Sequence, residues 1–526
     1  MMSIKRTVCY GLFIILLGIT PSVIHAYLRP ESGFYPQIRS QIKHSFLQEN
    51  DTYRIDRITP AEPGLHHPFH GLRDLGDAIA EYFSPGDPQS AMCLYSVNDE
   101  GLKLHTEMNV IAGGDLFQHD DYDYSFLYKG IRFNTYILKG IEEKHSSVYD
   151  GFGMRALWWN GGFWGDLNGI LASPLVDGYY KHNESRIDID NLTADIYYNH
   201  PRFTLAIGRG RFQTGNSISG SIILNDTCND YGYFLAEGFT GPFTLSFMHG
   251  SLIADSILAL YDNASVNHKN LPDKYIATHQ ITYETGDRWR LFAGETIIYG
   301  KRGLEINYLL PHTFWRVTEH NQHDRDNVLI YAGGSFRPHP RVLLYGQAFL
   351  DELRYAELFG NWWGNKYALQ GGINLLLANP AVLHNQAPQI TLEVSAVRPW
   401  SYTHYLDYNK YSHDRRSLGY PKGANLLDLS CELNLPLLKT LRWDSHASYT
   451  KQGSTGNNYS LNYAHLIPDI DTTQTRWFEG NVTKTLKLTS NLAFAGMAHH
   501  RFLIGITSTY VINWKHAIFG SWQMSF

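Results

Sequence analysis

The last nine residues of this 526-residue chain alternate between two kinds of side chain. Counting back in twos from the end gives one face that is apolar or glycine: Phe526, Met524, Trp522, Gly520 and Ile518. The other face is mostly serine and glutamine, and Phe519 is its one apolar exception. Because successive side chains of a β-strand point to opposite faces, the chain is predicted to end on a strand with one apolar face.

The first 26 residues have the pattern of a secretory signal. Lys5 and Arg6 precede an apolar run from Tyr10 to Ile19, and the small residue Ala26 follows. The apolar run is too short for a spanning helix, which needs about 20 residues. We expect a signal peptide over 1–26, cleaved near Ala26.

The remaining chain offers no helix that could span a membrane. It is 43% hydrophobic overall with a mean hydropathy of -0.29, and no later stretch is uninterruptedly apolar over such a length. A closed barrel is the other way to satisfy every backbone polar group in lipid. A final strand ending on Phe526, in an exported chain, resembles the end of bacterial outer-membrane barrels. The 14% aromatic content suits two interfacial girdles.

Residues 89–526 are predicted to form this barrel. Period-two alternation runs through 102–110, 389–396 and 427–434, with charge confined to one face. At about 10 residues per strand plus turns, the region accommodates about 16–18 antiparallel strands. A soluble β-sandwich would alternate in the same way, and the signal and terminal Phe favour the barrel.

Residues 27–88 differ from the barrel region. Leu72, Leu75, Ile79 and Phe83 recur at helical spacing, and we predict a small α-helical element that is periplasmic or plugs the barrel. Long polar stretches at 255–272 and 402–422 are predicted extracellular loops.

Charge and cysteine content exclude several classes of protein. The formal charge is -6, or -8 once Lys5 and Arg6 are removed, so we expect no nucleic-acid partner. Cys93, Cys228 and Cys431 are widely spaced and odd in number, which predicts neither a disulfide framework nor a zinc site. We expect no cofactor and no bound metal.

Two mid-chain blocks are more specific than a generic barrel. They are Ile207–Asn225 and Gly294–Pro311, and they are followed by 319–321, 326–329, 344–351 and 418–423. In their order and spacing these segments resemble the capsule assembly Wzi family. The resemblance runs from about Leu102 to Phe526. It departs from the family pattern at 213–216 and at 225–230, where expected turn residues and prolines are missing.

The resemblance implies an outer-membrane barrel of Gram-negative type that attaches or organises capsular or extracellular polysaccharide without catalysis. Its partners would be that polysaccharide, outer-membrane lipid, and the barrel-assembly machinery acting through Phe526. The positions that match the family pattern are Arg209, Gly215, Gly220, Glu295, Tyr299, Glu305, Asn327 and Asp351.

We predict a polysaccharide-binding or structural network in the lumen. Glu295, Tyr299, Tyr345, Gln347 and Asp351 each lie on the odd-numbered face of their own strand, which we take to be the lumen. Basic residues would pair with these carboxylates or contact an anionic glycan. The full predicted set is Arg209, Arg211, Glu295, Tyr299, Arg302, Glu305, Asn327, Gln347 and Asp351.

Two aromatic clusters admit two interpretations. Trp158–Trp164 and Trp362–Trp363 offer flat faces for sugar rings, but barrels also place aromatics at the lipid interface. The girdle is the favoured interpretation for both clusters.

Other functions are less well supported by the sequence. The segment 215–220 lacks the spacing of a nucleophile elbow, so we expect no enzyme. The alternative function is an outer-membrane porin or substrate channel, which would need an open lumen.

Overall fold

A computed structural model describes the chain from Met92 to Ser525. The residues within this range that it leaves undescribed are 100–101, 140–149, 168–169, 171–179, 184–185, 201, 256–271, 286–287, 358–359, 378–387, 439 and 498–499. The predicted signal peptide, the predicted helical element over 27–88 and Phe526 itself lie outside the described residues.

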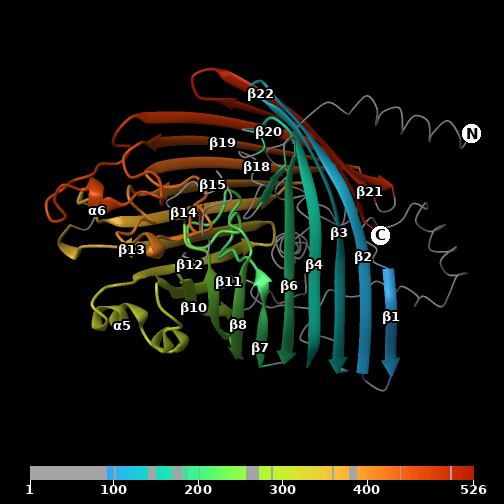
Figure 1. The fold of residues 1–526 in the computed structure, drawn as a ribbon, viewed down its shortest axis with the longest axis horizontal. Helices are drawn as coiled ribbons and strands as arrows, with labels where there is room; N and C mark the ends of the chain where they lie inside the picture. The colour runs from blue at the N-terminus through green and yellow to red at the C-terminus, as the bar shows by residue number, and fades with distance from the viewer. Residues whose placement is uncertain are drawn as a thin grey trace, which may run out of the picture.

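The described chain forms a closed antiparallel barrel of 18 strands (Figure 1). The first nine ring strands are β2 (Leu102–His119), β3 (Asp123–Lys139), β4 (Asp150–Gly165), β6 (Arg186–His200), β7 (Phe203–Gly210), β8 (Tyr231–Thr240), β9 (Phe243–Leu252), β10 (Lys274–Thr285) and β11 (Trp289–Gly300). The other nine are β12 (Asn327–His339), β13 (Val342–Glu352), β14 (Lys366–Leu376), β15 (Gln389–Val397), β18 (Leu426–Leu438), β19 (Leu441–Gly453), β20 (Val482–Met497), β21 (His500–Tyr510) and β22 (Trp514–Ser525). The predicted barrel and its strand number are confirmed.

The barrel closes where β22 pairs with β2. Ser525 lies opposite Ile111, and Ala517 lies opposite His119. The remainder of the same edge of β2 is paired by β1 (Met92–Asp99), from Met108 to Leu102. A further short strand, β5 (Tyr180–Asn183), pairs with β6, and β16 (Ser412–His413) pairs with β17 (Arg416–Ser417) in a separate sheet.

Alternation along each strand separates an apolar outer face from a largely polar inner face. On β15, Leu392 and Val394 are 44% and 43% exposed, whereas Glu393 between them is buried. On β18, Leu429 is exposed and Asp428 is buried. Two residues directly opposite each other on paired strands point to the same side of the sheet. The pairing register therefore shows, strand by strand, which residues face inward and which face outward. The predicted outer faces of 389–396 and 427–434 are confirmed.

The apolar exception in the final strand points inward. Phe519 is fully buried, and its ring lies against Gly505 of β21, the residue directly opposite. A similar pair joins β4 to β6, where the ring of Tyr197 covers Gly153. Glycine leaves room for a flat aromatic ring on the inner wall.

The two ends of the barrel differ in their connections. One end has short turns such as 241–242 and 340–341. The other end carries the long segments 211–230, 301–326, 398–425 and 454–481. These hold the short helices η3 (Ile306–Leu309), α5 (Trp315–Asn321), η6 (Asp407–Asn409) and α6 (Tyr463–Leu466), while η4 (Tyr355–Glu357) lies in the connection from β13 to β14. Within the described range, every helix falls short of the length and apolar character needed to cross a bilayer.

Candidate functional site: the lumen plug and its rim

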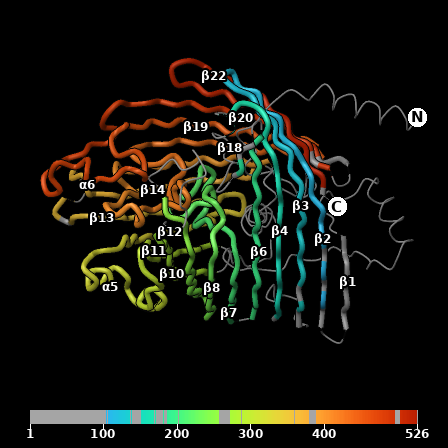
Figure 2. The backbone as a smooth tube through the Cα atoms, viewed as in Figure 1, coloured from blue at the N-terminus to red at the C-terminus, as the bar shows by residue number. Residues whose placement is uncertain are grey.

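Two long segments fold into the barrel and pack against each other. They are 211–230 and 398–425, here called the lumen plug, and Figure 2 shows them in green and orange among the strands. The hydroxyl of Tyr402 donates to the carbonyl of Ile222 at 2.8 Å, and that of Tyr411 donates to Ile223 at 2.7 Å. The backbone N–H of Asn225 donates to the carbonyl of Leu418 at 2.8 Å.

An apolar core holds the lumen plug against the inner wall. Plug residues contribute Ile222, Ile223, Leu224, Tyr402, Tyr411, Leu418 and Tyr420, each at most 4% exposed. The inner faces of β8 to β15 and β18 contribute residues such as Met248, Ile276, Leu329, Phe349 and Val397. The polar stretch 402–422, predicted as an extracellular loop, is for the most part buried in the barrel interior, with exposed positions such as Tyr405.

Glu393 of β15 anchors the first plug segment. Its carboxylate accepts the backbone N–H groups of Ile218 and Ser219, at 3.0 and 3.1 Å. It also accepts the hydroxyls of Ser217, at 3.2 Å, and Tyr345, at 2.7 Å. The predicted site residues did not include Glu393. The strand over 389–396 was predicted, and Glu393 is the one acidic residue in it.

Gln347 is where the sequence predicted it, on the inner wall. Its side-chain amide donates to the hydroxyl of Ser221 at 3.1 Å and to the side-chain oxygen Oε1 of Gln370 at 2.5 Å. Gln370 in turn donates to the carbonyl of Gly220 at 2.9 Å. Gly220 has a φ of 96°, a conformation that favours glycine, and the turn presents its carbonyl to the wall.

Three more predicted residues bind the plug. Asp351 accepts the backbone N–H of Tyr402 at 2.9 Å, and Asn327 donates to the carbonyl of Asn409 at 2.9 Å. Arg211, buried within the plug itself, pairs with Asp230 at 2.7 Å. Arg211 was expected to pair with the carboxylates of the predicted set or to contact a glycan, and its buried partner is a different acid.

The placement of Glu295 and Tyr299 in the lumen is wrong. Glu295 lies opposite Ile330, which is 40% exposed, and therefore points to the outer face of the wall. Odd numbers face outward on β11 but inward on β13, because the residue opposite Glu295 on β12 is even-numbered and that register continues to Leu350. Whether a residue number is odd or even therefore does not show which way its side chain points on a different strand.

Residues 301–326, here called the outer-wall segment, cover these two polar groups. Trp315 at the start of α5 is fully buried, stacks on His279 at 4.1 Å and donates its backbone N–H to Glu295 at 2.7 Å. The hydroxyl of Tyr299 is 2.7 Å from a ring nitrogen of His249. Figure 1 shows α5 outside the strands, beside β10.

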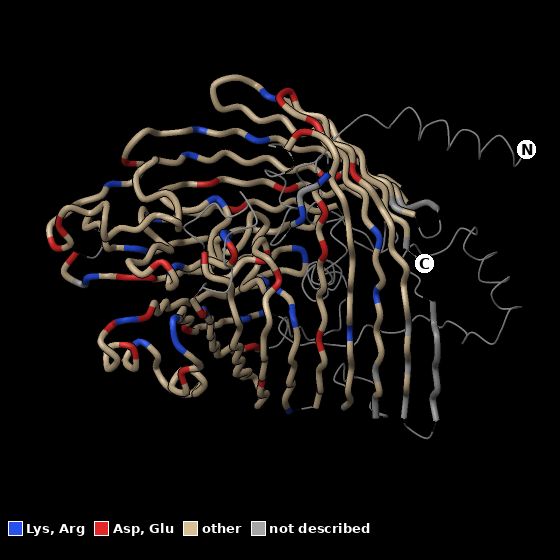
Figure 3. The backbone as a smooth tube through the Cα atoms, in the orientation of Figure 1, with Lys and Arg blue, Asp and Glu red and all other residues tan. Residues whose placement is uncertain are grey.

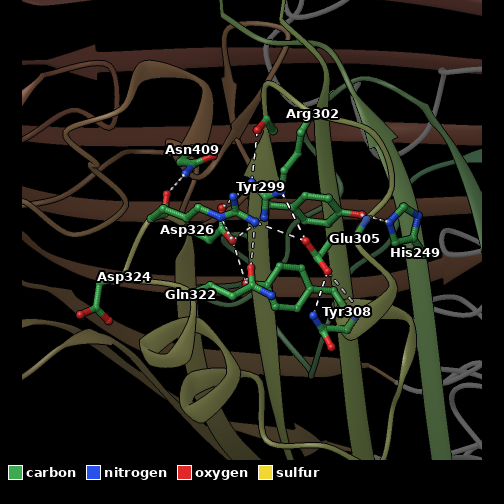
Figure 4. Close-up of polar contacts among 12 residues, drawn as sticks. His249, Tyr299, Arg302, Glu305, Tyr308, Gln322, Asp324, Asp326 and Asn409 are labelled. Atoms are coloured by element: carbon green, nitrogen blue, oxygen red, sulfur yellow. Dashed lines mark hydrogen bonds and ion pairs between the residues drawn. The ribbon is translucent and has the colours of Figure 1, made fainter.

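Arg302 and Glu305 belong to a polar network at the rim of the barrel (Figure 4). The guanidinium of Arg302 donates to both carboxylate oxygens of Asp326, at 2.9 and 2.6 Å, and Tyr308 donates to the same carboxylate at 2.7 Å. Glu305 lies 3.3 Å from Arg325. This network joins both ends of the outer-wall segment.

The rim also connects to the plug. Asn409 donates to the carbonyl of Arg325 at 2.8 Å and accepts, through its own carbonyl, from Asn327. The rim network and the second plug segment therefore form one hydrogen-bonded unit.

Arg209 lies apart from the rest of the predicted set. It is exposed on the outer face of β7 beside Leu205 and Ile207, and its guanidinium donates to the carbonyl of Leu192 at 3.1 Å. The hydrogen bond of Arg209 therefore goes to the wall, although its charge acts on His413 of the plug.

The aromatic clusters do not act as uniform girdles. Trp158 faces outward and is 43% exposed, but Trp159 is buried on the inner face. Trp362 and Trp363 are both buried and donate their indole N–H groups to the carbonyl of Ile470 at 2.9 and 2.8 Å. The favoured girdle interpretation is wrong for this second pair, which packs inside the loop cluster.

Two histidines of the plug are held in their neutral form. Burial lowers the pKa of His404 to about 3 and that of His413 to about 4, and the nearby cations Lys366 and Lys274 act in the same direction. Each ring accepts a backbone N–H through Nδ1, from Leu406 for His404 and from Ile253 for His413.

In the part of the chain that the structure describes, one group of acidic and histidine side chains is close enough to share a metal ion. It consists of Glu319, His320 and Asp324 at the end of α5. Glu319 already pairs with Arg316 at 2.7 Å, so the group is an ion-pair cluster.

An 18-strand barrel with an apolar outer face and two segments folded into its interior has the architecture of outer-membrane β-barrel proteins. Neither a protein-family model nor a curated protein matches this chain.

Solved structures do match. One is "Wzi, an outer membrane protein involved in group 1 capsule assembly in Escherichia coli", described as a carbohydrate-binding β-barrel; it is 15% identical over 80% of this chain and 84% of its own, with a TM-score of 0.50. OpdK of Pseudomonas aeruginosa, solved with vanillate, is 11% identical over 80% of this chain and 99% of its own, with a TM-score of 0.45. OccK5 (OpdH) of the same organism is 8% identical over 80% and 97%, with a TM-score of 0.43. The Wzi similarity supports the barrel fold.

Proposed function

We propose that this protein is an outer-membrane barrel that holds or organises polysaccharide at the cell surface, without catalysis. The observation that carries the proposal is the lumen plug. The strand wall encloses two segments that are bonded to it by Glu393, Gln347, Gln370 and Asp351. Two segments fixed inside the barrel in this way suit a rigid binding platform better than a wide channel.

The plug and its neighbouring segment build a surface suited to sugars. Tyr405 is 39% exposed and packs beside Tyr463, with ring centroids 6.3 Å apart. Asn462 donates to the carbonyl of Tyr405 at 2.9 Å. This bond fixes the backbone at Tyr405, and the exposed ring offers a flat apolar face on which a sugar ring could stack.

Charges of both signs surround this surface. Figure 3 shows Lys and Arg alternating with Asp and Glu along the segments at the long-loop end. Arg354, for example, pairs with Asp471 at 2.6 Å while lying over the ring of Trp362. Under this proposal the long-loop end faces outward, and the chain reaches the outer membrane after cleavage near Ala26 and assembly through Phe526.

Binding of purified polysaccharide to the purified barrel tests the proposal. Tyr405→Ala should weaken binding, because it removes the exposed ring while leaving the buried core intact. Tyr510→Ala is the matched control, since Tyr510 is similarly exposed at 41% but lies on the outer wall. Equal binding by both variants and the wild type would reject Tyr405 as a contact.

A porin or substrate channel is the second candidate. The inner face of β19 and β20 is polar, with Asp444, Ser448, Lys487, Thr489 and Asn491 facing the lumen. A polar inner wall is a feature that a channel shares. Conductance in planar bilayers distinguishes the two functions: stable, steady channels favour the porin, and a closed barrel favours the platform.

A further inference from the structure

The outer-wall segment connects β11 to β12 and exposes several large apolar side chains. Its outward side carries large apolar side chains that are 37–75% exposed: Leu304, Ile306, Leu310, Phe314 and Val317. Its inward side buries Tyr308 and Trp315 completely against the barrel wall. The segment therefore has one face fixed to the protein and one apolar face without a protein partner among the described residues.

The height of this segment on the barrel follows from the strands beneath it. An aromatic belt marks the short-turn end of the outer wall, where Trp289 stacks on Phe336 at 4.0 Å and Phe243 lies beside Tyr283. With strands tilted by about 40°, each residue climbs about 2.5 Å, so an apolar band of about 25 Å extends about ten residues upward from Trp289. It ends near Tyr299.

Glu295 falls inside that band, about 15 Å above the belt by the same rise. A lipid-exposed carboxylate at such depth is costly, as is an exposed imidazole like that of His279. The outer-wall segment covers both groups, and Trp315 contacts both. In this sector the segment thus replaces the strands as the outermost surface at membrane height.

We infer that the outer-wall segment is embedded in the outer leaflet, where Leu304, Ile306, Leu310, Phe314 and Val317 contact the acyl chains of the lipid. The apolar face continues the lipid-facing band that Ile281, Leu291 and Ile330 form lower on the wall. The segment begins at Lys301, directly after β11, which is near the top of the band; the exposed Lys301 ammonium is then at the height of anionic headgroups. The inference rests on membrane insertion of the barrel but not on polysaccharide binding.

Site-directed spin labelling of the full-length barrel in anionic phospholipid nanodiscs tests this inference. Single cysteines would be placed at Phe314 and Val317 in a background with the native cysteines replaced by alanine. Leu291 provides the lipid reference on the strand wall, and Asp471, with a side chain 78% exposed, provides the water reference. The measured quantity is the ratio of relaxation by oxygen to relaxation by a water-soluble nickel chelate.

The expected ratio at Phe314 and Val317 equals that at Leu291 and is several-fold above that at Asp471. A ratio at Phe314 and Val317 equal to that at Asp471, with Leu291 still in lipid, would overturn the inference and leave the barrel proposal standing. A water-like ratio at Leu291 as well would overturn membrane insertion itself, and this inference with it.

Discussion

The carboxylate of Glu393 accepts the backbone N–H of Ile218 at 3.0 Å, across 175 residues of sequence. The bond joins the inner wall of the barrel to the first plug segment at the middle of its turn. Since Ser219 and Ser217 donate to the same carboxylate, one side chain fixes three consecutive residues. Whether the lumen is a filled platform depends on contacts of this kind.

Replacing Glu393 by Gln should loosen residues 211–225. Only one amide oxygen remains to accept, and the amide NH2 faces backbone donors, so about 1–3 kcal/mol of local stability should be lost. Hydrogen exchange of 211–225 in the intact barrel measures this loss. Gln389→Ala is the control, because Gln389 is on the same inner face but bonds to Asn434. Unchanged protection in Glu393→Gln would show that the apolar core alone holds the plug.

Acidification should release the second plug segment. The packed segment keeps His404 and His413 neutral down to about pH 3 and pH 4, whereas a released segment takes up protons below the ordinary pKa of 6.5. Because the packed segment binds fewer protons at these two histidines than the released segment, their contribution to the stability of the packed segment is complete above pH 6.5. It declines as the pH falls toward 4. Exchange protection of 398–425, corrected for intrinsic rates, should fall between pH 7 and pH 5.

The control for this pH dependence is the double variant His404→Asn, His413→Asn. Asparagine retains an acceptor near the position of Nδ1 but does not titrate. Over the same pH range the double variant should lose less exchange protection than the wild type, because the contribution of the two histidines is gone. An equal loss in the wild type and the double variant would assign the effect to other groups.

Arg302→Ala should destabilise the rim network more than the removal of an exposed charge in the same network. Asp326 is fully buried and would lose its bidentate partner, which costs about 3–5 kcal/mol for a buried pair. Arg325→Ala, at a residue that is 46% exposed, should cost at most about 1 kcal/mol. Hydrogen exchange measures the free energy of local opening of the outer-wall segment in each variant, and so compares the two costs. Equal costs would place the main support of the rim elsewhere.

Gly153→Ala should strain the wall between β4 and β6. A Cβ at this position would lie 2.1 Å from Cζ of Tyr197, and such overpacking costs about 1–3 kcal/mol. Tyr197→Leu should rescue much of the loss in a double-mutant cycle of unfolding in lipid vesicles. Gly238→Ala, with nothing within 4 Å of its Cβ, is the neutral control. A purely additive double mutant would show that the ring is not the obstacle.

The alternation of single strands was enough to predict the barrel, its apolar outer face and the direction of residues such as Gln347 and Asp351. It failed for Glu295, because the side on which a residue points depends on its pairing partner and not on its number. It did not reveal that 402–422 is mostly buried, because tyrosine, serine and histidine also suit a polar interior, where Tyr402 and Tyr411 bond to backbone carbonyls and Tyr420 bonds to Asp428. The role of the outer-wall segment depends on contacts between residues on separate strands, such as Trp315 with His279, which no local pattern encodes.

The distribution of polysaccharide between cells and medium tests the proposed function most directly. A deletion strain would be compared with strains that carry the wild-type chain or Tyr405→Ala, with total production measured in each. The proposal predicts that deletion sheds polysaccharide into the medium at unchanged total production, and that the wild-type chain restores retention while Tyr405→Ala restores it only in part. Full retention in the deletion strain, with altered uptake of small solutes, would contradict the proposal and favour the channel.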